Sequence, residues 1–302
     1  MAIVNRGNFS KLLWPGLNKI YGEAYAQYPN EYLELFDKNT SDKSFEEDIG
    51  TSGFGLAAVV GEGASVTYDD MQQGFISRYT HVKYGLGFII TEEMVDDDQY
   101  MNVAKKKAPA LAQSLMQTKE TVGANVYNRA FNSSYTGGDG LELCSTAHVN
   151  VAGGTWSNEL TVAADMSEAS LEQACIDIMA FTNDRGLKIA VSPVSLVIPT
   201  ALSFEVQRIL KSPLQSGNSN NDINVLKMIG KFSKVVVNHY LTDADAWFIR
   251  TSALDGMKYF ERKADAFAED NDFDTSNLKY KATGRYSFGW TDPRGIFGSP
   301  GA

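Results

Sequence analysis

The chain has 302 residues, 43% of them hydrophobic and 21% charged, so it is globular and can bury a sizeable core in one large or two smaller domains. Its formal net charge of −10 argues against a reader of nucleic acid, because phosphate binding rests on concentrated lysine and arginine. Two cysteines cannot form a disulfide framework. The sequence shows no signal peptide and no apolar run of membrane-spanning length, so we expect a protein assembled in the cytoplasm.

The first 50 residues combine aromatic side chains at roughly helical spacing with residues that interrupt helices. The aromatic residues are Trp14, Tyr21, Tyr25, Tyr28, Tyr32 and Phe36, and the interruptions are Pro15, Gly22 and Pro29. We expect an arm with one or two short helices that contacts a neighbouring subunit, so that its removal leaves a folded domain. The alternative is an ordinary first helix packed on the domain core.

Two segments rich in β-forming residues follow, residues 54–60 and 75–90, on either side of a tip with Gly61, Gly63 and the pair Asp69-Asp70. This pattern predicts a long extended hairpin. A lone two-stranded hairpin is marginally stable in water, and its open edges and apolar residues need a cover. We therefore interpret the hairpin as an attachment device, which favours assembly over catalysis.

A long amphipathic helix is predicted within residues 91–131. Thr91 and the acidic residues after it are a good helix start, because acids favour the positive end of the helix dipole. One apolar stripe consists of Ala104, Ala108, Leu111, Leu115, Val122 and Val126. Because Pro109 cannot donate its hydrogen bond, we expect a break or kink near residues 105–108 and a clean helix over 109–129.

The rest of the chain mixes loops, helices and strands, which predicts an α+β fold. Residues 132–166 are rich in loop formers, and a helix with Leu171, Ala174 and Ile178 on one face is expected to end at Arg185-Gly186. Strands are expected at residues 187–200, 225–230, 233–241, 246–251 and 278–290, with a helix at 201–212 between the first two.

Cys144 and His148, four residues apart in a loop, form the best candidate for catalysis. A cysteine–histidine pair needs an orienting third group and an oxyanion site, and the sequence signals neither. A zinc site needs more ligands than this segment holds. We therefore expect a structural loop and predict no catalytic residue.

An acidic run near the C-terminus resembles a calcium loop, since Asp270, Asp272 and Asp274 match the first three ligand positions. Thr275 and Lys281 stand where that loop needs glycine and glutamate, so the motif fails. The run, which begins with Asp265 and Glu269, is interpreted as a solvated acidic surface.

Two further charged clusters carry weak signals. The carboxylates of Asp96, Asp97 and Asp98 do not share a helix face, so they do not converge on a metal. Residues 105–107, all lysine, could touch phosphate, but a carboxylate of a neighbouring subunit fits them equally well. With no glycine-rich phosphate loop present, the sequence predicts no metal, cofactor or catalytic site.

Five phrases in order carry a family resemblance: ITEEMVDDDQ (90–99), LCSTAHVN (143–150), LVIPTAL (196–202), VVNHYLTDADAWFI (236–249) and TGRYSFGWTDPRGIFG (283–298). Together they resemble the major capsid proteins of tailed phages, most closely the Mu-like prophage major head subunit group. The resemblance covers the chain from about residue 10. Val149 departs from it, because the family often has proline after the histidine.

The resemblance implies the tailed-phage major capsid fold, which encapsulins and herpesvirus capsid proteins share. It implies an N-arm (1–52), an E-loop (53–88), a peripheral domain (89–160 with 261–290) containing a spine helix, and an axial domain (161–260 with 291–302). It further implies a virion protein that assembles as hexamers and pentamers into an icosahedral shell around double-stranded DNA, without sequence-specific DNA binding. Further partners would be a scaffolding protein, a portal and optionally a decoration protein.

Two alternatives remain at this stage. An encapsulin-type nanocompartment would enclose an enzyme instead of DNA, and a cargo-peptide groove or the neighbouring genes would reveal it. An enzyme using Cys144 and His148 is the less favoured alternative. No segment before the hairpin is long enough for a cleaved scaffold, so we expect either a separate scaffolding protein, which Met1 favours, or a sequence that is the mature form. No lysine–asparagine pair is marked for cross-linking.

Overall fold

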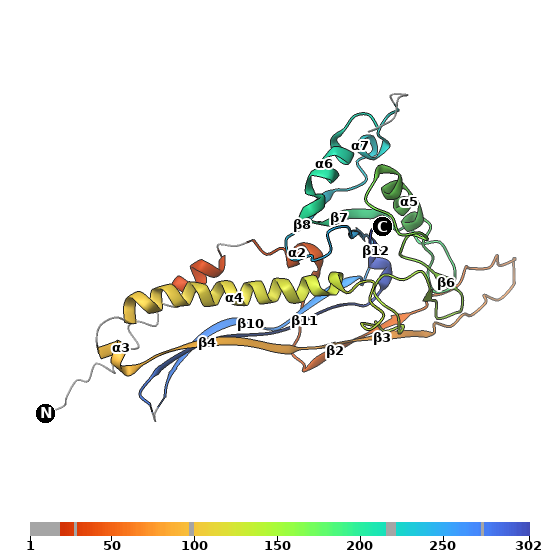
Figure 1. Ribbon diagram of the computed structural model, residues 1–302. Helices are drawn as coiled ribbons and strands as arrows, with labels where there is room; N and C mark the ends of the chain where they lie inside the picture. Colours follow the sequence, from red (N-terminus) through yellow and green to blue (C-terminus); the bar gives the residue numbers. More distant parts are fainter. Residues whose placement is uncertain (1–18, 27–28, 97–99, 216–221, 273–274) are drawn as a thin grey trace.

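The computed structural model describes residues 19–26, 29–96, 100–215, 222–272 and 275–302. Figure 1 shows an elongated layer, built from a long helix and a long sheet, with a more compact lobe standing over one end of it. A loop projects from that same end, beyond the lobe. The mixture of helices and separate sheets confirms the α+β prediction.

The long layer is a four-stranded sheet with helix α4 along one face (Figure 1). The strand order is β1 (Asp37–Thr40), β10 (Met257–Asn271), β11 (Leu278–Trp290) and β4 (Val82–Ile90). Only β1 and β10 run parallel. Burial alternates along the middle of β11, where Tyr280, Ala282 and Tyr286 are buried. The period-two pattern of residues 278–290 therefore predicted this strand correctly, whereas β10 was missed.

Helix α4 (Tyr100–Asn128) is continuous, so the predicted start at residue 109 is wrong. Pro109 lies inside the helix and leaves the carbonyl four residues earlier without its helical donor. The apolar stripe compensates for this loss, because Leu111, Ala112 and Leu115 are buried in one cluster with Tyr280 of the sheet. Packing on the sheet thus overrides the local cost of the proline.

The compact lobe contains a second four-stranded sheet, ordered β12 (Ile296–Ser299), β9 (Trp247–Thr251), β7 (Pro193–Pro199) and β8 (Lys234–Asn238). It packs with helices α5 (Glu168–Met179) and α6 (Ser203–Lys211), the latter preceded by the 3₁₀ turn η2 (Thr200–Leu202). The predicted helix at 201–212 and the strands at 233–241 and 246–251 are confirmed within a few residues. The strand predicted at 187–200 exists but begins six residues later, at Pro193. Two other predictions in this region differ from the structure.

Residues 225–230 form helix α7 (Val225–Ile229) and not the predicted strand. The Asn224 side chain caps its first turn by accepting from the Lys227 amide, and Gly230 ends it at φ 62°. The second difference is the end of α5, which stops at Met179, six residues before the predicted Arg185-Gly186. Gly186, at φ 76°, belongs to a separate turn.

The hairpin exists, but its first strand is β2 (Phe45–Thr51), which pairs antiparallel with β3 (Gln73–Thr80). The predicted strand at residues 54–60 is wrong, because residues 53–72 form a loop without strand pairing. This loop is the segment that projects beyond the compact lobe in Figure 1. After His81 the chain continues from β3 into β4.

The described part of the N-terminal region packs on its own chain. It comprises helical residues 19–26, α2 (Tyr32–Leu35) and β1. Tyr21, Tyr32 and Phe36 are buried in clusters with residues of α4 and the long sheet, so the expected contact of these rings with a neighbouring subunit is wrong. The spacing of the aromatic residues could not distinguish a contact with a neighbouring subunit from packing on the chain's own core. The strands that cover these rings, β10 and β11, come from the far end of the chain. Trp14 and Tyr28 lie outside the described residues.

The remaining elements are short. They are α3 (Glu92–Asp96), β5 (His148–Val149), β6 (Thr155–Trp156) and η3 (Pro293–Gly295).

Candidate assembly surfaces

The loop of residues 53–72, called the projecting loop below, exposes apolar side chains that the described part of the chain does not cover. Val59 is 100% exposed, Tyr68 95% and Leu56 82%. Burying a large apolar side chain is worth about 1.5–3 kcal/mol, so such an array is costly in water unless a partner covers it. The charges of the loop are Glu62, Asp69 and Asp70, with no basic residue.

One cation tethers the projecting loop to the compact lobe. The Asp69 carboxylate accepts the Gly55 amide at 2.8 Å and Nη1 of Arg185 at 2.7 Å. Arg185 also donates to the main-chain carbonyl of Asp70. The Gly55 amide, followed by Arg185, holds the pKa of Asp69 below its usual value. The loop is therefore guided by polar contacts at its base while its apolar side chains stay open.

A second exposed apolar surface lies on helices α6 and α7 of the compact lobe. Phe204 is 77% exposed, Met228 71% and Ile229 59%. Both surfaces are apolar, and they lie on different parts of the subunit (Figure 1). Two separate uncovered patches are what a subunit needs if it contacts several neighbours.

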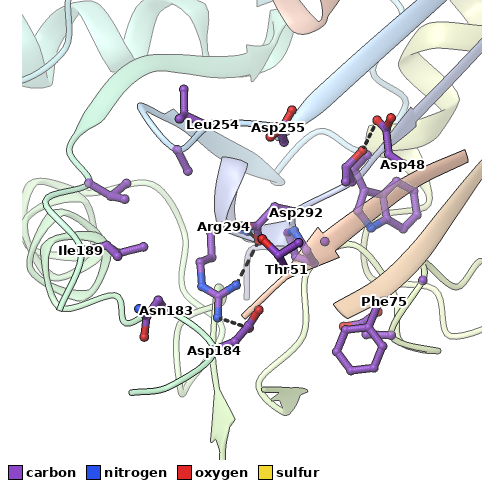
Figure 2. A pocket seen from close by; sticks show the side chains of 18 of the residues that line it. Asp48, Thr51, Phe75, Asn183, Asp184, Ile189, Leu254, Asp255, Asp292 and Arg294 are labelled. Carbon is purple, nitrogen blue, oxygen red and sulfur yellow. Dashed lines mark hydrogen bonds and ion pairs between the residues drawn. The ribbon is translucent and has the colours of Figure 1, made fainter. Parts of the chain in front are cut away.

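A cleft of about 550 Å³ lies at the base of the projecting loop, where β2, the compact lobe and the end of β11 meet. Figure 2 shows Arg294 between Asp184 and Asp292 in this cleft. Arg294 is 6% exposed and also donates to the Thr182 carbonyl at 2.7 Å and to Asn150 Oδ1 at 2.8 Å. Burial raises the pKa of Asp292. The arginine thus joins three chain segments, and its donors are used in holding them together.

Cys144 and His148, the candidate catalytic pair, are both buried. Burial raises the pKa of the Cys144 thiol well above its usual value, so it stays protonated instead of becoming a thiolate nucleophile. His148 Nδ1 lies 2.6 Å from Asp139 Oδ2, and its ring stacks on Trp156 at 4.9 Å between centroids. Sequence reasoning missed Asp139, which lies only nine residues before the histidine but belongs to no recognised spacing. The contacts of His148 therefore hold the loop in place. They do not activate the Cys144 thiol.

The acidic run does not form a uniformly solvated surface, because Asp265 is buried. Its carboxylate lies 2.6 Å from Lys119 Nζ and accepts the Tyr25 hydroxyl at 2.6 Å. Both charged side chains are at most 5% exposed. No local signal could have shown this pairing, since Lys119 lies on α4, 146 positions earlier in the chain. Asp270 is exposed as expected, and Asp274 lies outside the described residues.

The two other charged clusters give no converging site. Asp97 and Asp98, and the side chains of Asp96 and Lys105, lie outside what the structure describes. Lys106 and Lys107 are exposed on α4. Within the described ranges, no group of three histidine, cysteine or acidic side chains is arranged to hold a metal ion. None of the described helices is both long enough and apolar enough to cross a membrane.

These features define a class: an elongated two-part subunit with exposed apolar surfaces on the projecting loop and on helices α6 and α7. The family model described as "Phage capsid protein" matches residues 75–298, well over half of the chain. The chain therefore belongs to the phage capsid protein family. A search of curated proteins gave no match.

Solved structures confirm the tailed-phage capsid fold. The procapsid protein of bacteriophage JBD30 superimposes with a TM-score of 0.53 at 13% identity, over 98% of this chain and 76% of that one. The protein of Mycobacterium phage Patience gives 0.52 at 11% identity, over 98% and 88%. The capsid of the Myoviridae phage XM1 gives 0.51 at 12% identity, over 91% and 92%. At such identities the likeness concerns the fold.

Proposed function

We propose that this capsid protein is the major head subunit of a tailed double-stranded-DNA phage or prophage, which assembles as hexamers and pentamers into an icosahedral shell around the genome. The exposed apolar side chains of the projecting loop carry the proposal, because the described part of their own chain leaves them open for a neighbour to cover. The family match favours this function over an encapsulin-type compartment. The order of the five sequence phrases further favours the Mu-like prophage group.

Within this proposal the subunit divides into an N-arm (1–52), an E-loop (53–88), a peripheral domain (89–160 with 261–290) and an axial domain (161–260 with 291–302). The long sheet with α4 supports the peripheral assignment, and the compact lobe supports the axial one. From residue 19 onward the described part of the N-arm anchors the subunit core, because its rings are buried there.

The partners we propose are further copies of the chain, a scaffolding protein, a portal, a decoration protein, and packaged DNA held without sequence readout. The acidic net charge supports loose contact with DNA, since a shell must not bind its contents tightly. We assign the protein to the virion, with assembly in the host cytoplasm, and assign it no catalytic activity. The buried, protonated Cys144 supports that last assignment.

Electron microscopy of the purified full-length protein tests the proposal. Closed shells, or rings of five and six subunits, are expected once the concentration allows association. A protein that stays a monodisperse monomer over a wide range of concentration and salt would sink the proposal.

A further inference from the structure

A groove of about 520 Å³ separates the C-terminal half of α4 from strand β3 and the end of β11. Its apolar wall includes Val126, Phe288 and Trp290, and Tyr135 at its rim is 43% exposed. Arg78 and Arg129 also line it, and no aspartate or glutamate does. We call it the arginine groove. Its volume is that of sites that hold small ligands or a few peptide residues.

The two arginines are positioned by aromatic rings and are only partly neutralised. The Arg129 guanidinium carbon lies 4.2 Å from the centre of the Tyr135 ring, and that of Arg78 lies 3.9 Å from the Phe45 ring. Arg78 is 3.8 Å from Glu47, at the edge of an ion pair, whereas Arg129 has no carboxylate partner among the described residues. Stacked, under-neutralised arginines are well suited to binding a carboxylate.

The projecting loop carries a segment with the complementary chemistry, Tyr68-Asp69-Asp70-Met71. Its tyrosine is 95% exposed and its methionine 45%. The Asp70 carboxylate accepts no hydrogen bond or ion pair from a side chain that the structure describes. Asp69 is held by Arg185, which does not line the groove, so a subunit does not place this segment in its own groove.

We infer that the arginine groove receives residues 68–71 of a second copy of this chain, with the Asp70 carboxylate on Arg129 and the flanking tyrosine and methionine on the apolar wall. The inference rests on the proposed self-assembly and names the surface that receives the loop. Each copy offers one groove and one segment, so the contact is head-to-tail and closes into a ring when the rotation permits. Arginine and aromatic residues at its centre are typical of energetically dominant interface contacts.

A charge exchange tests this pairing. Arg129→Glu places two acids against each other and is expected to lower shell yield at least tenfold. Asp70→Arg alone should lower it similarly, whereas the double variant Arg129→Glu/Asp70→Arg should regain at least half of the wild-type yield. The matched control is Lys43→Glu, an equal charge change at a side chain that is 74% exposed and outside the groove. Adding Lys43→Glu to Asp70→Arg should not restore the shell yield that Asp70→Arg lowers.

A direct measurement accompanies the exchange. Titration of unassembled full-length subunits with a synthetic peptide of residues 66–72 should change the tryptophan fluorescence, because Trp290 lies in the groove. The change should be lost in Arg129→Glu. Thermal unfolding of each variant subunit checks that it is folded.

Normal shell yield from folded Arg129→Glu would overturn the inference while leaving self-assembly intact. So would a folded double variant that stays as defective as the single ones, since the groove would then take a different acidic protein or nothing. Wild-type protein that never assembles would instead contradict the proposed function. Peptide binding that persists in Arg129→Glu also overturns the assignment.

Discussion

The long layer and the projecting loop treat charge and apolar surface in opposite ways. In the long layer even charged groups are buried and paired, as with Lys119 and Asp265 at 2.6 Å. In the projecting loop even large apolar groups such as Val59 are fully exposed. The core of the layer is buried within one chain, whereas the loop has no such core. Subunit stability and assembly are therefore carried by different residues, which makes the two separable by mutation.

The largest loss is expected from Leu111→Asp with Leu115→Asp, which should abolish soluble folded protein. Both leucines are at most 4% exposed against the long sheet. Truncating a buried leucine costs about 2–5 kcal/mol, and an unpaired buried charge costs more. The sum reaches the total stability of a domain. Expression in the soluble fraction and far-UV circular dichroism measure the outcome; a normally folded double variant would show that this face of α4 is not core.

Deleting residues 1–45 is expected to unfold the long layer, contrary to what the sequence alone suggested. The deletion removes buried Tyr32, Leu35 and Phe36 together with strand β1 at the sheet edge. It also leaves the buried Glu120 carboxylate without the two amides it accepts, those of Glu31 and Tyr32. Circular dichroism on the truncated chain is the measurement. Deletion of residues 1–18 alone is the control, and a stable fold after the longer deletion would restore the original interpretation.

Lys119→Ala should cost about 3–5 kcal/mol, because among the described residues it leaves the buried Asp265 carboxylate with the Tyr25 hydroxyl alone. Lys119→Met with Asp265→Leu should recover most of that loss, since an apolar pair of similar volume needs no desolvation of charge. Chemical denaturation of the three proteins gives the free energies of unfolding. If Lys119→Ala is as stable as the wild type, water reaches the Asp265 carboxylate and the ion pair is not buried.

The contrast between layer and loop also explains which features the sequence could predict. The period-two pattern of residues 278–290 and the apolar stripe of α4 follow the alternation of buried and exposed positions, so strand β11 and helix α4 were both predicted. The helical conformation of Val225–Ile229 depends on the caps Asn224 and Gly230, which compete with a β-rich composition over five residues. The partners of Asp265 and His148 depend on tertiary contacts that no spacing encodes. The projecting loop was recognised as uncovered, but not as strandless, because neither its composition nor its turns specify pairing.

A smaller, pH-dependent effect is expected at Glu120, whose pKa burial raises to about 7. The folded state then binds this proton more tightly than the unfolded chain, where the usual value is 4.5. The stabilisation is full below pH 4.5 and is lost as the pH rises through about 7, by up to about 3 kcal/mol. The difference in unfolding free energy between wild type and Glu120→Gln, measured from pH 4.5 to 8, isolates this group. If that difference in unfolding free energy does not change with pH, the predicted contribution of Glu120 is wrong.

The smallest effect on the subunit, and a large one on the shell, is expected from shortening the projecting loop. Replacing residues 62–70 with a short Gly-Ser link keeps strands β2 and β3 and removes mainly exposed groups. The midpoint of thermal unfolding of the unassembled subunit should stay within a few degrees, since exposed loop residues contribute little to it. Shell yield, counted by electron microscopy, should fall sharply, or the shells should break on osmotic shock. The double variant Leu56→Ser/Val59→Ser keeps the length of the loop and removes two of its exposed apolar side chains. Comparing its shell yield with that of the shortened variant shows whether apolar contact or loop length matters. If the shortened variant gives shells of normal yield and toughness, the loop is a passive surface segment, and the division between a layer that folds within one chain and a neighbour-dependent loop fails.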